Sequence, residues 1–424
     1  NNNNNNNSTF RYQYQFRNAA LDWMATNEDL ERTTTTGVVS STTSVRMLVE
    51  RYALAVLYFS TGGNQTWTDS LSFLASNKTV CDWNSNNDEN NRKIQEDKIV
   101  GNVAVLAAST DISTGKNNAT TTTTTTTVEE DPDPDNNRIE KGVFCSGGSR
   151  FVTSIEIPDN VLQGTIPWEL SLLQYLVKIN FDTNKLYGSI PKELSRLSRL
   201  QALWLATNDL TGELPREFAD ATQLASIDLE ENRLSSTVPS QWGLSLSNLL
   251  YVGLRLNALT GTLPSEWQRL RKLQTLDLGG NRLDGTIPQE YGELTDIEEL
   301  YLESNRFEGS LPPTFGKLTN LLRLFVDDNR LTGTVPTEYS ALTSSLEYFW
   351  FHGNAGLTGS VNSTFCDPDR SVPVLWLNGE DASINLKSNC LSNDLDGSPA
   401  QIECPCCTSC CDSNGTNCTS NSSR

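Results

Sequence analysis

Leucine and other apolar residues recur in a fixed pattern over the second half of the chain. From Phe151 onward the motif LxxLxLxxNxLxGxIP repeats. Its asparagines lie 24 or 25 residues apart, at Asn160, Asn184, Asn208, Asn232, Asn257, Asn281, Asn305, Asn329 and Asn354. One such unit cannot bury its apolar positions alone, but it can do so by stacking on copies of itself. The pattern predicts an α/β solenoid over 151–361, with nine repeats and a parallel β-sheet on the concave side of a horseshoe.

The invariant positions of the motif are interpreted as structural. The leucines are expected to point inward. The asparagine amide both donates and accepts hydrogen bonds, so it can satisfy backbone groups where each strand ends. The glycine and proline that close the motif suit tight backbone approach and the end of the unit.

The regions outside the repeats have other patterns. Helical spacing of apolar residues between 16 and 30 and in Val45–Ser60 predicts two helices. We divide the chain into a flexible tail with one short helix (1–44), an N-terminal cap (45–150) with a low-complexity insertion (84–141), the repeats (151–361), and a Cys-rich C-terminal cap and tail (362–424).

Charge, cysteines and glycosylation signals narrow the function classes. The net charge of −20 and pI near 4.5 exclude nucleic acid and anionic membranes as main partners. Ten cysteines indicate an oxidising compartment. Sequons occur on caps and tails but not within 151–361, and include Asn64, Asn77, Asn118, Asn362 and Asn414. The sequence contains neither a bilayer-spanning apolar run nor a signal peptide, so we expect a processed or truncated piece of a secreted or surface protein.

Catalysis has little support in the sequence. His352 is the only histidine, and no nucleophile motif accompanies it. Kinase signatures, a glycine-rich phosphate loop and a zinc-protease helix are absent. We therefore expect a protein that is not an enzyme and that uses no cofactor or catalytic metal.

Side chains between the leucines of each strand should project from the concave face. Equivalent positions of successive repeats can be read as columns. One column is aromatic towards the C-terminal repeats, and the next outward-facing column, two residues further along each repeat, is mostly acidic. The predicted ligand-binding residues are Trp204, Asp228, Tyr251, Arg255, Asp277, Tyr301, Glu303, Phe325, Asp327, Trp350, His352 and Trp376. Tyr301, Phe325, Trp350 and Trp376 should form an exposed ladder about 15 Å long, because neighbouring strands lie about 4.8 Å apart.

Three functions follow, from different classes. The first is recognition of a protein, peptide or glycan on this strip; the alternative for the aromatic residues is that they stack merely to cover the sheet. The second is a structural or adhesive wall or matrix glycoprotein, in which the Thr/Asn-rich tails act. The third is Ca²⁺ capture by carboxylates, at Asp228, Glu230, Asp277, Glu303 and Asp327, although an acidic column is more simply a solvated face. The oligomeric state stays open.

The motifs resemble a known family. LxGxIP, the CDW at Cys81 and the GVFC at Gly142–Cys145 resemble plant-type leucine-rich-repeat proteins, namely receptor-like kinase ectodomains and polygalacturonase-inhibiting proteins, over about two thirds of the chain. The resemblance implies a leucine-rich-repeat horseshoe and a disulfide between Cys81 and Cys145, across the long insertion.

The flanks resemble a narrower group. AALDWMATNEDL, VERYALAVLYFSTGGNQTW and CPCCTSCC are similar to segments of diatom membrane-anchored leucine-rich-repeat proteins. That resemblance implies the ectodomain of a type II membrane protein. At the other end, Cys366 and Cys390 bracket one more strand-like segment and are expected to pair as a terminal cap. The six cysteines of 404–418 are disulfides or a thiolate metal site, with disulfides favoured.

Overall fold

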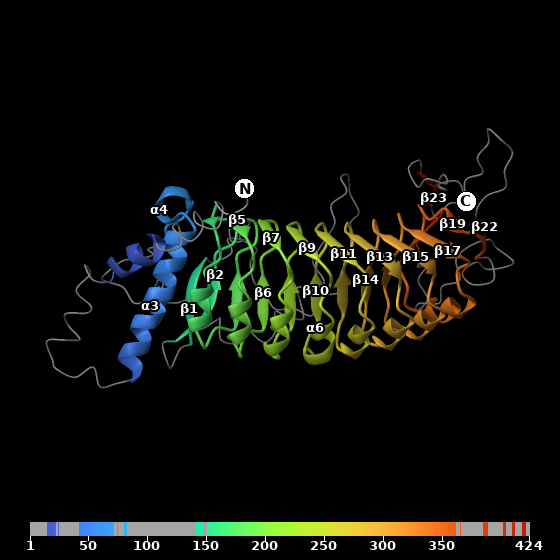
Figure 1. Cartoon of the computed structure of the whole chain (residues 1–424). Coiled ribbons are helices and arrows are strands. Elements are labelled where there is room, and N and C mark those ends of the chain that lie inside the picture. Colours follow the sequence, from blue (N-terminus) through green and yellow to red (C-terminus); the bar gives the residue numbers. More distant parts are fainter. Residues whose placement is uncertain are drawn as a thin grey trace, which may run out of the picture.

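A computed structural model describes most of the chain outside the long insertion and the tails. The described residues are 15–22, 24, 42–71, 74, 80–82, 141–146, 151–361 and 365, with the backbone of 385–388, 402–403, 409–411 and 418–420. The repeats stand side by side in a single row, with the N-terminal helix α3 (Thr42–Ser60) at one end (Figure 1).

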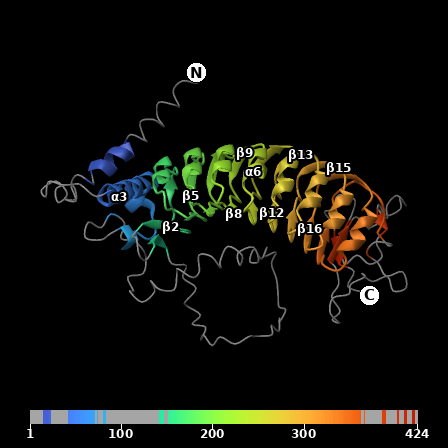
Figure 2. The ribbon, with the colours of Figure 1, turned by 90° about the horizontal axis from the view of Figure 1, so that it is seen from below.

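A sheet of 13 strands runs through the row and holds the candidate site. Between β1 and β24 each strand pairs in parallel with the next, and only the two end pairs are antiparallel. Figure 2 shows the row bending gently, with these strands along the inner side of the bend. In order the strands are β1 (Gly142–Cys145), β2 (Val152–Glu156), β4 (Lys178–Asn180), β6 (Ala202–Trp204), β8 (Ser226–Asp228), β10 (Tyr251–Gly253), β12 (Thr275–Asp277), β14 (Glu299–Tyr301), β16 (Arg323–Phe325), β18 (Tyr348–Trp350), β21 (Asn385–Ser388), β23 (Ser409–Cys411) and β24 (Cys418–Ser420).

A second parallel sheet, of nine strands, contains the motif glycine in most repeats; Ser236 replaces it in β9, and Gly359 of the last repeat lies in β20. Its strands are β3 (Gln163–Gly164), β5 (Lys185–Gly188), β7 (Asp209–Gly212), β9 (Arg233–Ser236), β11 (Ala258–Gly261), β13 (Arg282–Thr286), β15 (Arg306–Ser310), β17 (Arg330–Gly333) and β19 (Gly356–Leu357). A further pair joins β20 (Gly359–Ser360) to β22 (Ile402–Glu403).

One helical turn closes each of the first eight repeats on the outer side of the bend (Figure 2). Each turn follows the motif proline, whose fixed φ suits the residue that precedes a helix. The turns are η4 (Trp168–Leu172), η5 (Lys192–Arg196), η6 (Arg216–Asp220), α6 (Ser240–Ser245), η7 (Ser265–Arg269), η8 (Gln289–Glu293), η9 (Pro313–Lys317) and η10 (Thr337–Leu342).

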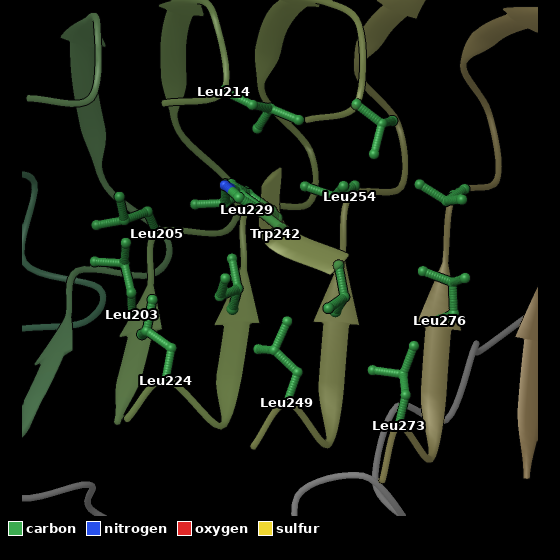
Figure 3. Close-up of a cluster of buried hydrophobic side chains, with 14 of the residues drawn as sticks. Leu203, Leu205, Leu214, Leu224, Leu229, Trp242, Leu249, Leu254, Leu273 and Leu276 are labelled. Atoms are coloured by element: carbon green, nitrogen blue, oxygen red, sulfur yellow. The ribbon is translucent and has the colours of Figure 1, made fainter. Parts of the chain in front are cut away.

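The motif leucines form one continuous core along the row. In Figure 3, Leu203, Leu229, Leu254 and Leu276 come from consecutive repeats and point into the same interior. Each of these side chains is fully buried. Because a side chain in one repeat packs on its counterparts in the next, the core grows in one dimension, as the sequence pattern predicts.

The repeat asparagines connect neighbouring units, which confirms their predicted role. Asn281 shows the arrangement: its Oδ1 accepts a hydrogen bond from Leu259 N at 3.1 Å. Its Nδ2 donates to the carbonyls of Leu254, Leu278 and Gly279 at 3.0 to 3.2 Å. The same pattern recurs at other repeat asparagines, for example Asn305. One side chain therefore satisfies backbone groups of two repeats at once.

The N-terminal cap covers the first repeat. Helix α3 begins at Thr42, three residues before the expected start, and is followed by α4 (Gly63–Thr66). The turn η1 (Val80–Asp82) contains Cys81, whose disulfide to Cys145 of β1 has a Cα–Cα distance of 5.5 Å. This is the bond that the family resemblance implies. The described part of the first helix is 15–22.

Several predictions concern residues outside the described part of the chain. They are Trp376, the Cys366–Cys390 pair and the sequons at Asn77, Asn118, Asn362 and Asn414. The sequon Asn64 is described and lies exposed in α4.

Replacing one buried asparagine of this ladder should destabilise the array. Asn281→Ala removes the amide whose Nδ2 bonds to three carbonyls and whose Oδ1 accepts from one N–H, which leaves buried backbone groups unsatisfied at about 1 to 3 kcal/mol each. We expect the urea midpoint of unfolding, followed by circular dichroism, to fall clearly below that of wild type. The exposed Asn320, which makes one bond to Thr295 O, gives the matched control Asn320→Ala. Equal midpoints for the two variants would contradict the ladder's role.

Candidate functional site

The concave face is formed by the side chains that alternate with the leucines of the inner sheet. Pairing without register shifts aligns equivalent positions, so that Asp228 lies beside Gly253, and Asp277 lies between Gly253 and Tyr301. Beyond each strand, the backbone continues to bond to the next repeat, as in Leu254 N to Asp277 O at 2.8 Å. The columns read from the sequence therefore exist as rows of adjacent side chains.

The predicted aromatic residues do meet, in a cluster that we call the aromatic stack: Tyr301, Phe325 and Trp350. Phe325 and Trp350 are parallel, with ring centroids 4.2 Å apart, and Tyr301 meets Phe325 edge-on at 5.1 Å. The prediction of an exposed ladder is wrong for two of them, since Tyr301 is 5 % and Phe325 8 % exposed. The rings lie against one another and shield each other from water; Trp350 is more exposed.

The acidic column is not a solvated face either. Glu303 and Asp327 are each 6 % exposed and His352 is 3 % exposed, and Asp277 of the neighbouring column is also 6 % exposed. Burial raises the pKa of Asp277 well above its usual range, with Glu303 adding to the effect. Carboxylates so placed have lost most of their water, which is costly unless a partner replaces it.

Two glycines explain how large side chains fit over this part of the sheet. Arg255 reaches across the repeat of Gly279 to bind the Glu303 carboxylate two repeats away, and lies 3.8 Å from Asp277. A Cβ at Gly279 would collide with both partners. At Gly253 a Cβ would lie 2.7 Å from Tyr251 Oη, which donates to Glu230 Oε1 at 2.9 Å.

Three carboxylates on the N-terminal side form an acidic cluster: Asp182, Asp228 and Glu230. Among the residues that the structure describes, none forms an ion pair with any of the three within 4.0 Å. Burial is the main cause of a raised pKa in each. The pKa of Asp182 is raised to about 6. Neighbouring carboxylates add to the rise in pKa at Asp228, whereas the Tyr251 hydroxyl and the charge of Arg255 partly offset the rise at Glu230.

The other cations of this face already have partners. Lys178 Nζ lies 2.8 Å from Glu156 and 4.0 Å from the Trp204 ring centroid, and Arg323 binds Glu299 in the neighbouring strand. Trp204 is fixed in addition by donating from Nε1 to Ser226 Oγ at 2.8 Å. Negative charge therefore predominates at the acidic cluster.

The sequence places Asp182 and Glu230 in the acidic column, but neither was among the predicted ligand-binding residues, and only Glu230 entered the calcium alternative. Asp182 stands in the same column as Glu230, so the signal was present. The sequence did not indicate the roles of Gly253 and Gly279. These roles become apparent only in the structure, where side chains of other residues occupy the space that a Cβ would fill.

Comparison with protein families agrees with the repeat fold. Two leucine-rich-repeat family models match, over residues 222–283 and 296–318. The chain is a leucine-rich-repeat solenoid. Its repeat domain is of a kind that typically binds and does not catalyse. No curated protein sequence matches the chain.

Solved structures similar to this solenoid include plant receptor ectodomains. The PEPR1–AtPEP1 complex is 25 % identical, with a TM-score of 0.48, over 52 % of this chain and 34 % of that one. The ectodomain of the receptor kinase GASSHO1/SCHENGEN3 from Arabidopsis thaliana, in complex with CASPARIAN STRIP INTEGRITY FACTOR 2, is 26 % identical with a TM-score of 0.47, over 61 % and 36 %. A plant ice-binding protein is 25 % identical with a TM-score of 0.44, over 51 % and 77 %.

The chain thus spans little more than a third of the length of those two receptor ectodomains. No helix in the described part has the length and apolar character needed to cross a bilayer.

The buried carboxylates predict that the fold is more stable in mild acid. Asp182 has a folded pKa of about 6, above its ordinary value, so the folded chain binds more protons than the unfolded chain between these two values. The free energy of unfolding should therefore rise as pH falls from 7.5 to 5, with Asp228 and Asp277 adding in the same direction. We expect Tm to increase by at least about 2 °C in calorimetry.

The variant Asp182→Asn tests the assignment of this effect. The amide oxygen can still accept the hydrogen bond from Ala206 N, now 2.8 Å from Asp182 Oδ1, but the side chain no longer titrates. The rise in Tm between pH 7.5 and 5 should be smaller in this variant. A rise as large as that of wild type would show that Asp182 is not one of the groups responsible.

Proposed function

We propose that the solenoid is an extracellular recognition module whose concave face binds a cationic segment of a peptide or protein. The observation that carries the proposal is the acidic cluster, which is mostly buried and has no ion pair within the described structure. A guanidinium or ammonium group seated there would replace the water that the carboxylates have lost. Hydrogen bonds to charged groups contribute about 1.5 to 3 kcal/mol each.

Neighbouring side chains suit such a ligand. Trp204 lies beside Asp228 in the sheet register and already accepts a cation over its ring. Tyr251 orients Glu230 through its hydroxyl. Aromatic rings beside carboxylates bind cations through both charge and ring quadrupole, whereas a neutral glycan would leave the carboxylates without countercharge.

The aromatic stack is a second contact surface for the ligand. Its distance from the acidic cluster sets the expected length of the ligand. From β8 to β18, the strand of Trp350, there are five steps between strands, about 24 Å, which an extended peptide covers in about seven residues. We therefore expect a ligand with a basic residue at one end and an apolar or aromatic residue about seven positions away, against the edge of Trp350.

An extracellular location is part of the proposal. The Cys81–Cys145 disulfide and the exposed sequon Asn64 support it. The type II membrane anchor and the diatom relationship remain predictions from the sequence.

Removing charge from the acidic cluster should abolish much of the affinity. The full chain would be tested on an array of eight-residue peptides that vary the number and position of Arg, Gln and Phe. For the peptides that bind, Asp228→Asn combined with Glu230→Gln should raise Kd at least tenfold and reduce its salt dependence, because each lost charge-assisted bond exceeds the 1.4 kcal/mol that corresponds to tenfold.

The control is Glu308→Gln, which removes one charge from an exposed position of β15 on the other sheet. It should bind as wild type does. Selection of peptides without Arg, or equal Kd values for the double variant and wild type, would refute the proposal.

A second candidate function comes from the nine-stranded sheet. The position after each motif glycine forms a hydroxyl rank, in which eight of nine residues are Ser or Thr: Thr165, Ser189, Glu213, Thr237, Thr262, Thr286, Ser310, Thr334 and Ser360. From Ser189 onward all are exposed. The adjacent repeats place them about 4.8 Å apart.

The threonines of the rank share one orientation. A Cβ placed on Gly285 would lie 2.7 Å from the Thr262 methyl, and one on Gly309 would lie 3.0 Å from the Thr286 methyl. Each methyl thus lies against the glycine of the next repeat. We propose that this periodic array of hydroxyls and methyls binds an ice surface, a ligand that is itself periodic.

Bulky charged substitutions on the rank test this candidate. The full chain should show thermal hysteresis and inhibit ice recrystallisation, and Thr262→Lys combined with Thr286→Lys should remove both effects by interrupting the array. The variant of Asp228 and Glu230 described above should retain them, since those residues lie on the other sheet. Absence of hysteresis in wild type, or its persistence in the lysine variant, would exclude the candidate.

A further inference from the structure

Three potential metal ligands converge at the C-terminal end of the concave face. Asp327 and Asp328 follow β16, and His352 follows β18 in the next repeat. One ligand atom from each lies within 4.8 Å of the others. Asp327 and His352 are almost fully buried, whereas Asp328 is exposed. The cluster is therefore accessible from one side only.

The backbone brings these groups together. Asp327 and His352 occupy equivalent positions of adjacent repeats, with His352 Nε2 at 3.6 Å from Asp327 Oδ2. Asp328 has a left-handed φ of +52°, and its N–H donates to His352 O at 2.9 Å. A Cβ at Gly353 would collide with Asp328 Oδ1, so the glycine leaves the space that the carboxylate occupies beside the imidazole.

A fourth carboxylate adds negative charge to the same place. Glu303 precedes Asp327 in the column and is 6 % exposed. Its Oε1 binds Arg255, but its Oε2 accepts no hydrogen bond from the described residues. Burial raises the pKa of Glu303, and the charge of Asp328 contributes to the rise. Buried carboxylates gathered beside a single imidazole form a setting in which a bound cation relieves repulsion.

We propose that Asp327, Asp328 and His352 bind a divalent first-row transition-metal ion. Two carboxylate oxygens and one imidazole nitrogen are a ligand set that suits Mn²⁺ or Zn²⁺, whereas Ca²⁺ prefers six to eight oxygen ligands. Because Asp328 is exposed, water or a group of a bound partner would complete the coordination shell. This site differs from the calcium alternative, which used carboxylates spread from β8 to β16, over five strands.

Metal binding here does not depend on the cationic ligand. Peptide affinity at the acidic cluster would be measured with a chelator present, and metal affinity with no peptide. Failure of one proposal therefore leaves the other intact.

Titration with Mn²⁺ tests the site. Mn²⁺ is the probe because thiolates select softer metals, so the cysteines of 404–418 contribute little to its binding. The full chain is treated with chelator and dialysed, and free Mn²⁺ is followed by electron paramagnetic resonance. We expect one Mn²⁺ bound per chain, displaced by Zn²⁺, with Asp328→Asn and His352→Gln each weakening binding at least tenfold.

Asp284→Asn is the matched control, since Asp284 is exposed on β13 of the other sheet. It should bind Mn²⁺ with wild-type affinity. Because His352 is buried, the folding of His352→Gln is first checked by circular dichroism. If that variant unfolds, Asp328→Asn alone tests the metal site, because Asp328 is exposed. Absence of Mn²⁺ binding, or wild-type affinity in Asp328→Asn, would overturn the assignment.

Discussion

The hydrogen bonds of the repeat asparagines are the constraint on which the rest of the structure depends. Strands of only three residues provide few ladder bonds, and the chain must leave each strand at the same point in every repeat. An asparagine such as Asn281 fixes that point by joining Leu254, Leu278 and Gly279 through one amide. Because its carbonyl partners belong to two repeats, every unit takes its register from its neighbour.

Fixed register turns a one-dimensional sequence into two surfaces that can be read as columns. On the inner sheet, the columns differ from repeat to repeat, so each part of that face carries its own set of side chains. On the other sheet, one column holds almost only Ser and Thr, which gives a periodic surface. The same backbone repeat therefore supports one face with varied side chains and one face with periodic side chains. The residues in each column decide which kind of face is formed.

The fold was largely predictable from sequence because repeat spacing reports backbone geometry directly. The concave residues were predictable as neighbours, and the aromatic stack confirms the register. Their burial was not predictable, since it depends on side chains that cross between repeats: Arg255 reaches Glu303 only because Gly279 has no Cβ. The hydroxyl rank was not predicted. Its residues lie between the glycine and the proline of each motif, and the turn at that point accounts for the spacing of the motif without any function.

The acidic cluster shows how a solenoid can carry an unfavourable site. Asp228 is desolvated and lies among other carboxylates, so its ionised form opposes folding at neutral pH. In a small globular domain several such groups would consume most of a net stability of about 5 to 15 kcal/mol. Here each repeat adds its own core contacts and asparagine bonds, so stability accumulates along the array while the unfavourable charges stay within a few strands. The desolvated carboxylates depart from the usual rules of burial, and the core contacts of the repeats on either side supply the compensating stability.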